Sequence, residues 1–150
     1  MGDFACQKSC GTLVEAWRWW DGEVEGLGVA RQGDRTSIPY GISANGHVIV
    51  GSSGSGAFLW DRAHGMRDLE PLLVALGAEL QGFELRGAWG VSDDGRRIMG
   101  PVRDPCTPNA DDYTYLAILP PACADRIDND GDDRVDSGDR GCHSRMDARE

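Results

Sequence analysis

Two stretches of the chain follow the same pattern, and this internal repeat limits the choice of folds more than any other feature. Residues 40–46 read Tyr-Gly-Ile-Ser-Ala-Asn-Gly and residues 89–95 read Trp-Gly-Val-Ser-Asp-Asp-Gly, an offset of 49 positions. A second pair, Ala-Trp-Arg-Trp at 16–19 and Ala-Phe-Leu-Trp at 57–60, is offset by 41 positions. Both offsets are near the length of one propeller blade, so we expect a sheet that recurs along the chain.

Each repeat has the composition of a short antiparallel meander. The aromatic-Gly-Ile/Val-Ser stretch predicts a strand, and the Asn, Asp and Gly residues after it predict a tight turn because they tolerate positive φ. Return strands are then expected at 48–51 and 97–100, and two further strands follow the first copy, at 57–60 and 65–69. With a loop at 61–64, this order predicts one four-stranded antiparallel sheet.

A single helix interrupts the strands. Residues 69–77 read Leu-Glu-Pro-Leu-Leu-Val-Ala-Leu-Gly. Proline is accepted in the first helical turn and glycine commonly follows the last one. We therefore predict a short helix over residues 71–76.

Composition places the chain in the all-β class and excludes some partners. Glycine is abundant, with 21 of 150 residues, and long apolar runs with helical spacing are scarce. The formal charge of -10 argues against nucleic acid and anionic membrane surfaces, which require a basic footprint. No run of 18 apolar residues encodes a membrane-spanning helix, so no membrane insertion is expected. We divide the chain into an N-terminal segment (1–12), sheet repeats (13–120) and an acidic tail (121–150).

The repeats resemble those of the bacterial HAF family, found in secreted and autotransported proteins. The resemblance covers residues 14–119 and rests on Glu-Ala-Trp-Arg-Trp, Tyr-Gly-Ile-Ser-Ala-Asn-Gly, Ala-Phe-Leu-Trp and Trp-Gly-Val-Ser-Asp-Asp-Gly. It implies antiparallel propeller-like sheets, about two blades of a partial propeller, in an exported protein without an established enzymatic activity. A complete propeller needs more blades. The chain is therefore expected to be the C-terminal end of something larger, or a truncated stack. The first ten residues do not have the pattern of a signal peptide, so we expect either a fragment or a true start other than Met1.

The tail carries the pattern of a twelve-residue calcium loop. Counted from Asp128, its carboxylates and one backbone carbonyl fall at the ligand positions of such a loop: Asp128, Asp130, Asp132, Arg134 (through its carbonyl), Asp136 and Asp139. Asp133 replaces the usual glycine at position six, and Asp139 replaces glutamate at position twelve. The segment is similar to the loops of thrombospondin type 3 and dockerin modules. The alternative interpretation is an acidic tail whose charges are merely solvated.

The five cysteines favour disulfides and an oxidising compartment over a zinc site. None forms a Cys-x-x-Cys pair. Cys123 and Cys142 bracket the calcium loop, and a disulfide between them would stabilise it by about 3 kcal/mol. Cys6 and Cys10 are close in sequence, Cys106 could pair with either, and the odd number leaves one thiol over. The predicted tail is therefore irregular, disulfide-stapled and calcium-binding.

The tryptophans suggest either core packing or stacking on sugar rings. We expect Trp19 and Trp60, at repeat positions, to wedge neighbouring sheets together. Trp17 and Trp20 are assigned to the face opposite Trp19 and are the candidates for a ligand face.

Together these features predict a non-enzymatic, extracellular or cell-surface structural or adhesive module. Its expected cofactor is calcium, and its expected partners are a glycan or another surface protein. The alternative is a fragment of a secreted carbohydrate-active hydrolase or a carbohydrate-binding platform, and a third choice is a pure spacer. A hydrolase would have two convergent carboxylates in a pocket, a binding module an exposed aromatic face, and a spacer neither.

Overall fold

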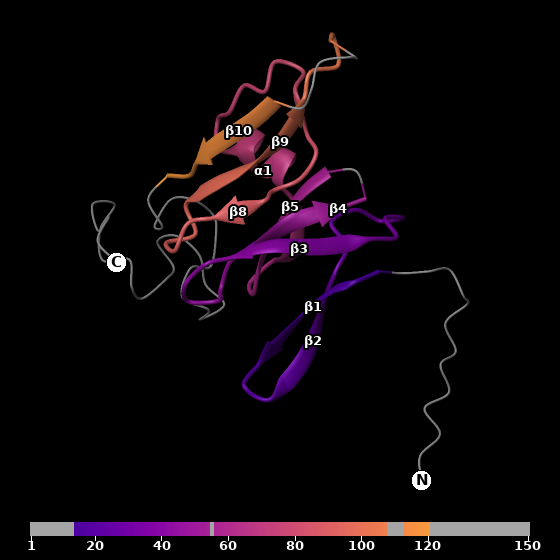
Figure 1. Cartoon of the computed structure of the whole chain (residues 1–150), viewed down its shortest axis with the longest axis vertical. Helices are drawn as coiled ribbons and strands as arrows, with labels where there is room; N and C mark the ends of the chain where they lie inside the picture. Colours follow the sequence, from indigo (N-terminus) through magenta and orange to yellow (C-terminus); the bar gives the residue numbers. More distant parts are fainter. Residues whose placement is uncertain (1–13, 55, 108–112, 121–150) are drawn as a thin grey trace.

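The structure, a computed structural model, describes residues 14–54, 56–107 and 113–120. It consists of three antiparallel sheets that follow one another along the chain (Figure 1). Strands make up 50% and helix 7% of the described residues, which confirms the predicted all-β class of antiparallel sheets. The strands are β1 (Ala16–Trp20), β2 (Glu23–Gly28), β3 (Ser37–Ile42), β4 (Ile49–Ser53), β5 (Gly56–Asp61), β6 (Gly65–Asp68), β7 (Glu84–Leu85), β8 (Gly90–Val91), β9 (Arg97–Arg103) and β10 (Tyr113–Ile118).

The middle sheet has the order β3-β4-β5-β6, as the repeat predicts. Each strand pairs antiparallel with the next, with Val50 opposite Leu59 at the β4–β5 junction. A register shift in β3, between Pro39 and Gly41, bends that edge strand. Before it in the chain lies the hairpin sheet, β1 with β2.

The terminal sheet has strands equivalent to the first three strands of the middle sheet, and the first of them is divided into β7 and β8. β9 is central, β10 pairs with one edge of it, and β7 and β8 both pair with the other edge. The division lies at Ala88, whose N–H donates to the carbonyl of Gly51 in the middle sheet at 3.0 Å. A backbone group that bonds to another sheet cannot also serve its own ladder, so β7 ends and β8 begins on either side of it.

The two repeat turns have the same hydrogen bonds. Ser43 N–H donates to Val48 O and Ser92 N–H to Arg97 O, both at 2.9 Å. The serine hydroxyl accepts the returning N–H, from Val48 at 3.0 Å and from Arg97 at 2.9 Å. Gly46 and Gly95 have φ of 78° and 74°, which explains the glycine at this point of each turn. The turns also touch, since Ala44 N–H donates to Asp93 O at 3.1 Å.

The helix α1 spans Leu69–Ala75, two residues earlier at its start than predicted. Asp68 is the N-cap and its side chain accepts from Glu70 N–H, so the strand β6 ends there and the helix begins at once. Leu69 therefore belongs to the helix and not to the predicted strand. Gly77, with φ of 97°, follows the C-cap, in agreement with the glycine stop signal.

The core lies on both faces of the middle sheet. One cluster joins Val50, Ala57 and Leu59 to the helix leucines and to the terminal sheet. The other joins Phe58 and Trp60 to the hairpin sheet. Residues 57–61 of β5 are consequently buried on both sides. The middle sheet is thus enclosed, whereas each neighbouring sheet has one face packed on it and one face turned outward.

Candidate functional site

The predicted calcium loop and its disulfide lie outside the described residues. This holds for Asp128, Asp130, Asp132, Arg134, Asp136, Asp139, Cys123 and Cys142. In the described ranges 14–54, 56–107 and 113–120, no three His, Cys, Asp or Glu side chains are grouped to hold a metal ion. Cys106 is exposed with a free thiol. Calcium binding remains a prediction.

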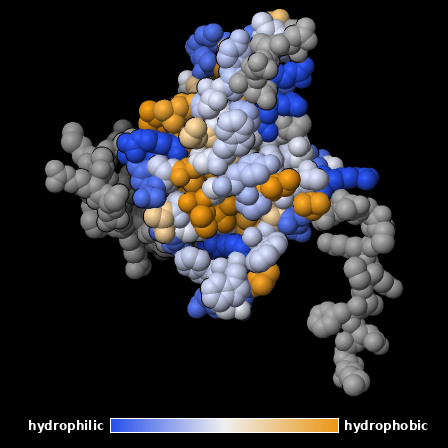
Figure 2. Space-filling model, in the orientation of Figure 1, coloured by the Kyte–Doolittle hydropathy of each residue, from blue (hydrophilic) through white to orange (hydrophobic). Residues whose placement is uncertain are grey.

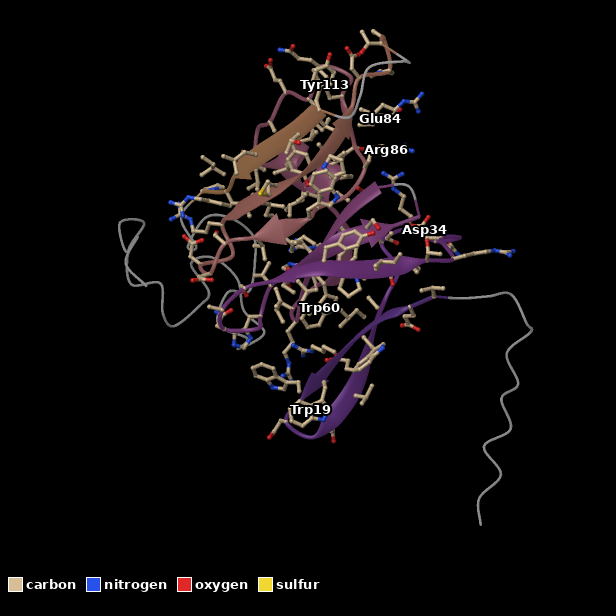
Figure 3. The ribbon with its side chains drawn as sticks, in the orientation of Figure 1. Trp19, Asp34, Trp60, Glu84, Arg86 and Tyr113 are labelled. Atoms are coloured by element: carbon tan, nitrogen blue, oxygen red, sulfur yellow. The ribbon has the colours of Figure 1, made fainter. Side chains whose placement is uncertain are left out.

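The tryptophan assignments are right for Trp60 and wrong for Trp19. Trp60 is 3% exposed and packs in the cluster between the middle sheet and the hairpin sheet. Trp19 is 66% exposed, on the outer face of the hairpin sheet (Figure 3). Trp17 lies on that same face and not opposite to it, because residues two apart in a strand point the same way. Trp20 does point to the face opposite Trp19, as predicted.

Arg18 holds the inward position that aromatic residues were expected to fill. Its side chain is 7% exposed, its Nε donates to Glu25 Oε2 at 2.7 Å, and its Cζ lies 4.2 Å from the centroid of the Trp60 ring. The Trp20 ring is 5.5 Å away, so the guanidinium lies near two indoles. A buried cation is tolerable here because it has both a carboxylate and aromatic faces as partners. The alternation Trp17-Arg18-Trp19 in the sequence already indicated that Arg18 lies on the face opposite the two tryptophans.

A charged pocket opens beside Trp20, on the hairpin sheet. Its volume is about 510 Å³. Its walls combine an indole, two guanidinium groups and three carboxylates: Arg18, Trp20, Asp21, Glu23, Val24, Glu25 and Arg62. An aromatic face with several hydrogen-bonding groups around it is suited to a polar, ring-containing ligand such as a sugar. The pocket unites Trp20 with residues that the sequence interpretation did not single out.

Trp20 is held in place by the first repeat turn. Its ring lies 5.4 Å from that of His47, tilted by 54°. A Cβ at Gly46 would come within 2.9 Å of the Trp20 ring, so this glycine is required by the contact as well as by its φ. The repeat turn therefore positions one wall of the pocket.

A second polar cluster surrounds the buried carboxylate of Asp61, at the end of β5. Asp61 is fully buried and accepts from His64 N–H at 3.0 Å, contacts His64 Nδ1 at 2.9 Å and accepts from Arg67. These bonds close the loop between β5 and β6. All three partners belong to one hairpin, so the cluster fixes local structure.

Comparisons with known proteins give no assignment: no family model, no curated protein and no solved structure matches the chain. Among the residues that the structure places, no helix is both long and apolar enough to cross a membrane. The HAF resemblance and the similarity of the tail to calcium loops stay predictions.

Proposed function

We propose that the chain is a non-enzymatic structural or adhesive module of an exported protein, in which stacked sheets present contact faces and a calcium-binding tail follows them. The observation that carries the proposal is the pair of apolar outer faces at the two ends of the stack. The outer face of the hairpin sheet carries Trp17, Trp19 and Val24, and that of the terminal sheet carries Met99 and Leu116. Contiguous exposed apolar surface on a folded domain is typical of an interaction site.

Calcium would serve structure in this proposal. Six oxygen ligands at alternating positions would draw the acidic tail into one conformation and neutralise carboxylates that otherwise repel one another. The chain has 25 acidic and 15 basic residues, so a cation is favoured electrostatically.

Calorimetric titration of the oxidised full chain with calcium tests the tail. We expect one site with a dissociation constant of about 0.1–1 mM, typical of extracellular modules, and its loss in the double variant Asp128→Ala/Asp132→Ala. The matched control, Asp111→Ala/Asp112→Ala, removes the same charge outside the loop and should bind as the wild type does. Absence of heat and of tail protection from proteolysis at several millimolar calcium would refute the calcium part of the proposal.

A carbohydrate-binding role is the second candidate, favoured by the pocket beside Trp20. An oligosaccharide ring stacked on that indole would meet the guanidinium of Arg18 and the carboxylate of Glu23. A screen against soluble oligosaccharides by tryptophan fluorescence, repeated with Trp20→Ala, tests it. Trp89→Ala is the control, because Trp89 is exposed but does not line the pocket. Binding that Trp20→Ala removes and Trp89→Ala retains would favour this role, whereas no binding in the wild type would exclude it for the sugars used.

A further inference from the structure

The hairpin sheet exposes two aromatic side chains that are buried at the same positions of the middle sheet. Trp17 and Trp19 follow Ala16 as Phe58 and Trp60 follow Ala57. Phe58 and Trp60 are almost fully buried because the hairpin sheet covers them. Trp17 and Trp19 are 62% and 66% exposed, since no described sheet covers the hairpin sheet in turn.

At the other end of the stack, the terminal sheet exposes a different pair of positions that are buried in the middle sheet. Met99 pairs with Leu116 across β9 and β10, as Val50 pairs with Leu59 across β4 and β5. Val50 and Leu59 are 0% exposed because the terminal sheet packs on them. Met99 and Leu116 are 47% and 64% exposed. Figure 2 shows hydrophobic surface in this region of the molecule.

The contact between the hairpin and middle sheets and the contact between the middle and terminal sheets use equivalent strand positions. Between the hairpin and middle sheets, Arg18, at the position of Leu59, lies over the ring of Trp60. Between the middle and terminal sheets, Leu59 shares a cluster with Tyr115, which pairs with Gly100 as Phe58 pairs with Gly51. In both, the Leu59 position of one sheet packs on the Phe58 or Trp60 position of the next.

The same packing pattern, applied once more, would place the terminal sheet of one molecule against the hairpin sheet of another. Leu116 occupies the Leu59 position and has no described sheet beyond it, while Trp17 and Trp19 occupy the Phe58 and Trp60 positions and have no described sheet before them. The borders carry opposite charges: the carboxylate of Glu15 lies over Gly26, beside Trp17. Arg97, whose Nη1 also contacts Asp94 at 3.2 Å, lies opposite Ile118 in the strand register, next to Leu116. Opposite charges at the rim of an interface favour one orientation.

We propose that the partner of these faces is a second copy of this chain, which docks end to end. Met99 and Leu116 of one copy lie against Trp17 and Trp19 of the next, and the contact continues the stacking of sheets within each chain. This inference rests on the proposed structural role and names its partner. Because the two faces differ, the contact is head-to-tail, so each dimer keeps one free end of each kind and can grow.

Two double variants test this orientation. Trp17→Thr/Trp19→Thr removes the hairpin face, and Met99→Thr/Leu116→Thr removes the terminal face. Threonine suits a strand and adds no charge. Sedimentation velocity of the oxidised full chain, from about 10 µM to about 1 mM, covers the range of weak interfaces. The wild type should increase in mass with concentration.

Each variant alone lacks one of the two faces in every molecule, so each should remain monomeric, with association weakened at least about tenfold as for loss of interface aromatic anchors. An equimolar mixture should form a one-to-one dimer and stop there, because only one complementary pair of faces remains. Val74→Thr, at an exposed position of α1, is the control and should associate as the wild type does. Circular dichroism and denaturant midpoints check that all variants are folded.

Three results would overturn the proposal: a monomeric wild type throughout the range, a dimer of the Met99→Thr/Leu116→Thr variant alone, or a mixture that remains monomeric. The second would mean that tryptophan faces pair with themselves, and the first that another protein or further repeats cover these faces. Calcium titration of the same samples separates this failure from that of the proposed function, since binding at the tail does not depend on the end faces.

Discussion

The middle sheet and the terminal sheet share a sequence pattern and a turn but differ in their surroundings. Ser43 and Ser92 close their turns with equivalent hydrogen bonds, and Gly51 and Gly100 each approach the preceding segment closely. Yet Leu59 is buried and Leu116 is exposed. Local geometry thus follows from the repeat, whereas burial depends on whether another sheet lies alongside.

As a result, one pair of equivalent positions holds a charged residue where it is buried and an apolar residue where it is exposed. Asp61 in β5 is fully buried, and Ile118, at the same place in β10, is 65% exposed. The buried carboxylate is stable because His64 and Arg67 satisfy it. The exposed isoleucine is the type of residue that the enclosed sheet would be expected to bury, which marks the terminal sheet as an open end.

The largest predicted effect tests whether the two sheets share their closest contact. A Cβ at Gly51 would overlap the carbonyl oxygen of Ile38, and one at Gly100 would overlap that of Gly87. Because the obstacle is backbone in both cases, Gly51→Ala and Gly100→Ala should each lower the free energy of unfolding by more than about 4 kcal/mol. Urea denaturation followed by tryptophan fluorescence measures this.

Gly87→Ala is the control for these glycines. A Cβ there would meet only the side chains of Ser52 and Pro101, at 3.6 Å or more, so the change should cost less than about 1 kcal/mol. A tolerated Gly100→Ala together with a damaging Gly51→Ala would show that the terminal sheet does not share the contact of the middle sheet.

Loss of the buried carboxylate of Asp61 should lower the free energy of unfolding more than gain of a carboxylate at the exposed position of Ile118. Asp61→Ala removes the buried carboxylate that accepts from His64 and Arg67, which should cost about 3 kcal/mol. Ile118→Asp places a carboxylate at the equivalent exposed position and should cost less than about 1 kcal/mol. Chemical denaturation of both variants gives the two values. Equal costs would contradict the view that enclosure, and not position in the repeat, decides polarity.

Much of the local structure could be predicted because it depends on neighbouring residues. The turns ending at Gly46 and Gly95, the short helix and the order of the middle sheet all follow from turn chemistry, capping and alternation. The division of β7 from β8 could not be predicted, because it results from the bond of Ala88 to Gly51 in another sheet.

The candidate site was less predictable than the fold. Alternation already places Trp17 and Trp19 on one face, so their assignment to opposite faces was an error of parity. The exposure of Trp19 depends on the absence of a covering sheet among the described residues, which no local pattern encodes. The pocket combines Trp20 of the hairpin sheet with Arg62 from the loop between β5 and β6 of the middle sheet, and such a pairing emerges only from the packed structure.

A smaller change in stability is expected at the position where the middle sheet has a phenylalanine and the terminal sheet a tyrosine. Tyr115 takes the place of Phe58, and its hydroxyl donates to Gly87 O at 2.9 Å. Tyr115→Phe should lower the free energy of unfolding by about 1 kcal/mol near neutral pH. Burial raises the pKa of Tyr115 well above its ordinary value near 10, so the folded state keeps a proton that the unfolded state loses. Stability should therefore fall as pH rises above about 10.

Tyr115→Phe should reduce that alkaline loss, which denaturant midpoints from pH 8 to pH 11 would reveal. Tyr40→Phe is the control, at an exposed residue of the middle sheet. An alkaline slope unchanged in Tyr115→Phe would contradict the assignment to this hydroxyl.

The smallest predicted effect separates the turns themselves. Asn45 and Asp94 both accept the serine hydroxyl and the N–H two residues on, but only Asp94 can titrate. The hydrogen bond from Ser92 lowers the pKa of Asp94, with further help from the Arg96 N–H and from Arg97. A depressed pKa in the folded state contributes stability above the unfolded value, near pH 4, and loses it as pH falls through the folded value.

Asp94→Asn converts the second turn to the chemistry of the first and should flatten this acid-side loss while keeping the fold. The reciprocal change, Asn45→Asp, should introduce a similar loss, because the hydroxyl of Ser43 and the N–H of His47 are already in place to hold a carboxylate. Denaturant midpoints between pH 7 and pH 3 measure both slopes. If Asp94→Asn leaves the slope unchanged, the depressed pKa assigned to Asp94 is contradicted. If instead the acid-side loss from Asp94 is larger than the loss that Asn45→Asp introduces, the charge of Arg97, which has no counterpart at Val48, is the first difference to remove, by Arg97→Val.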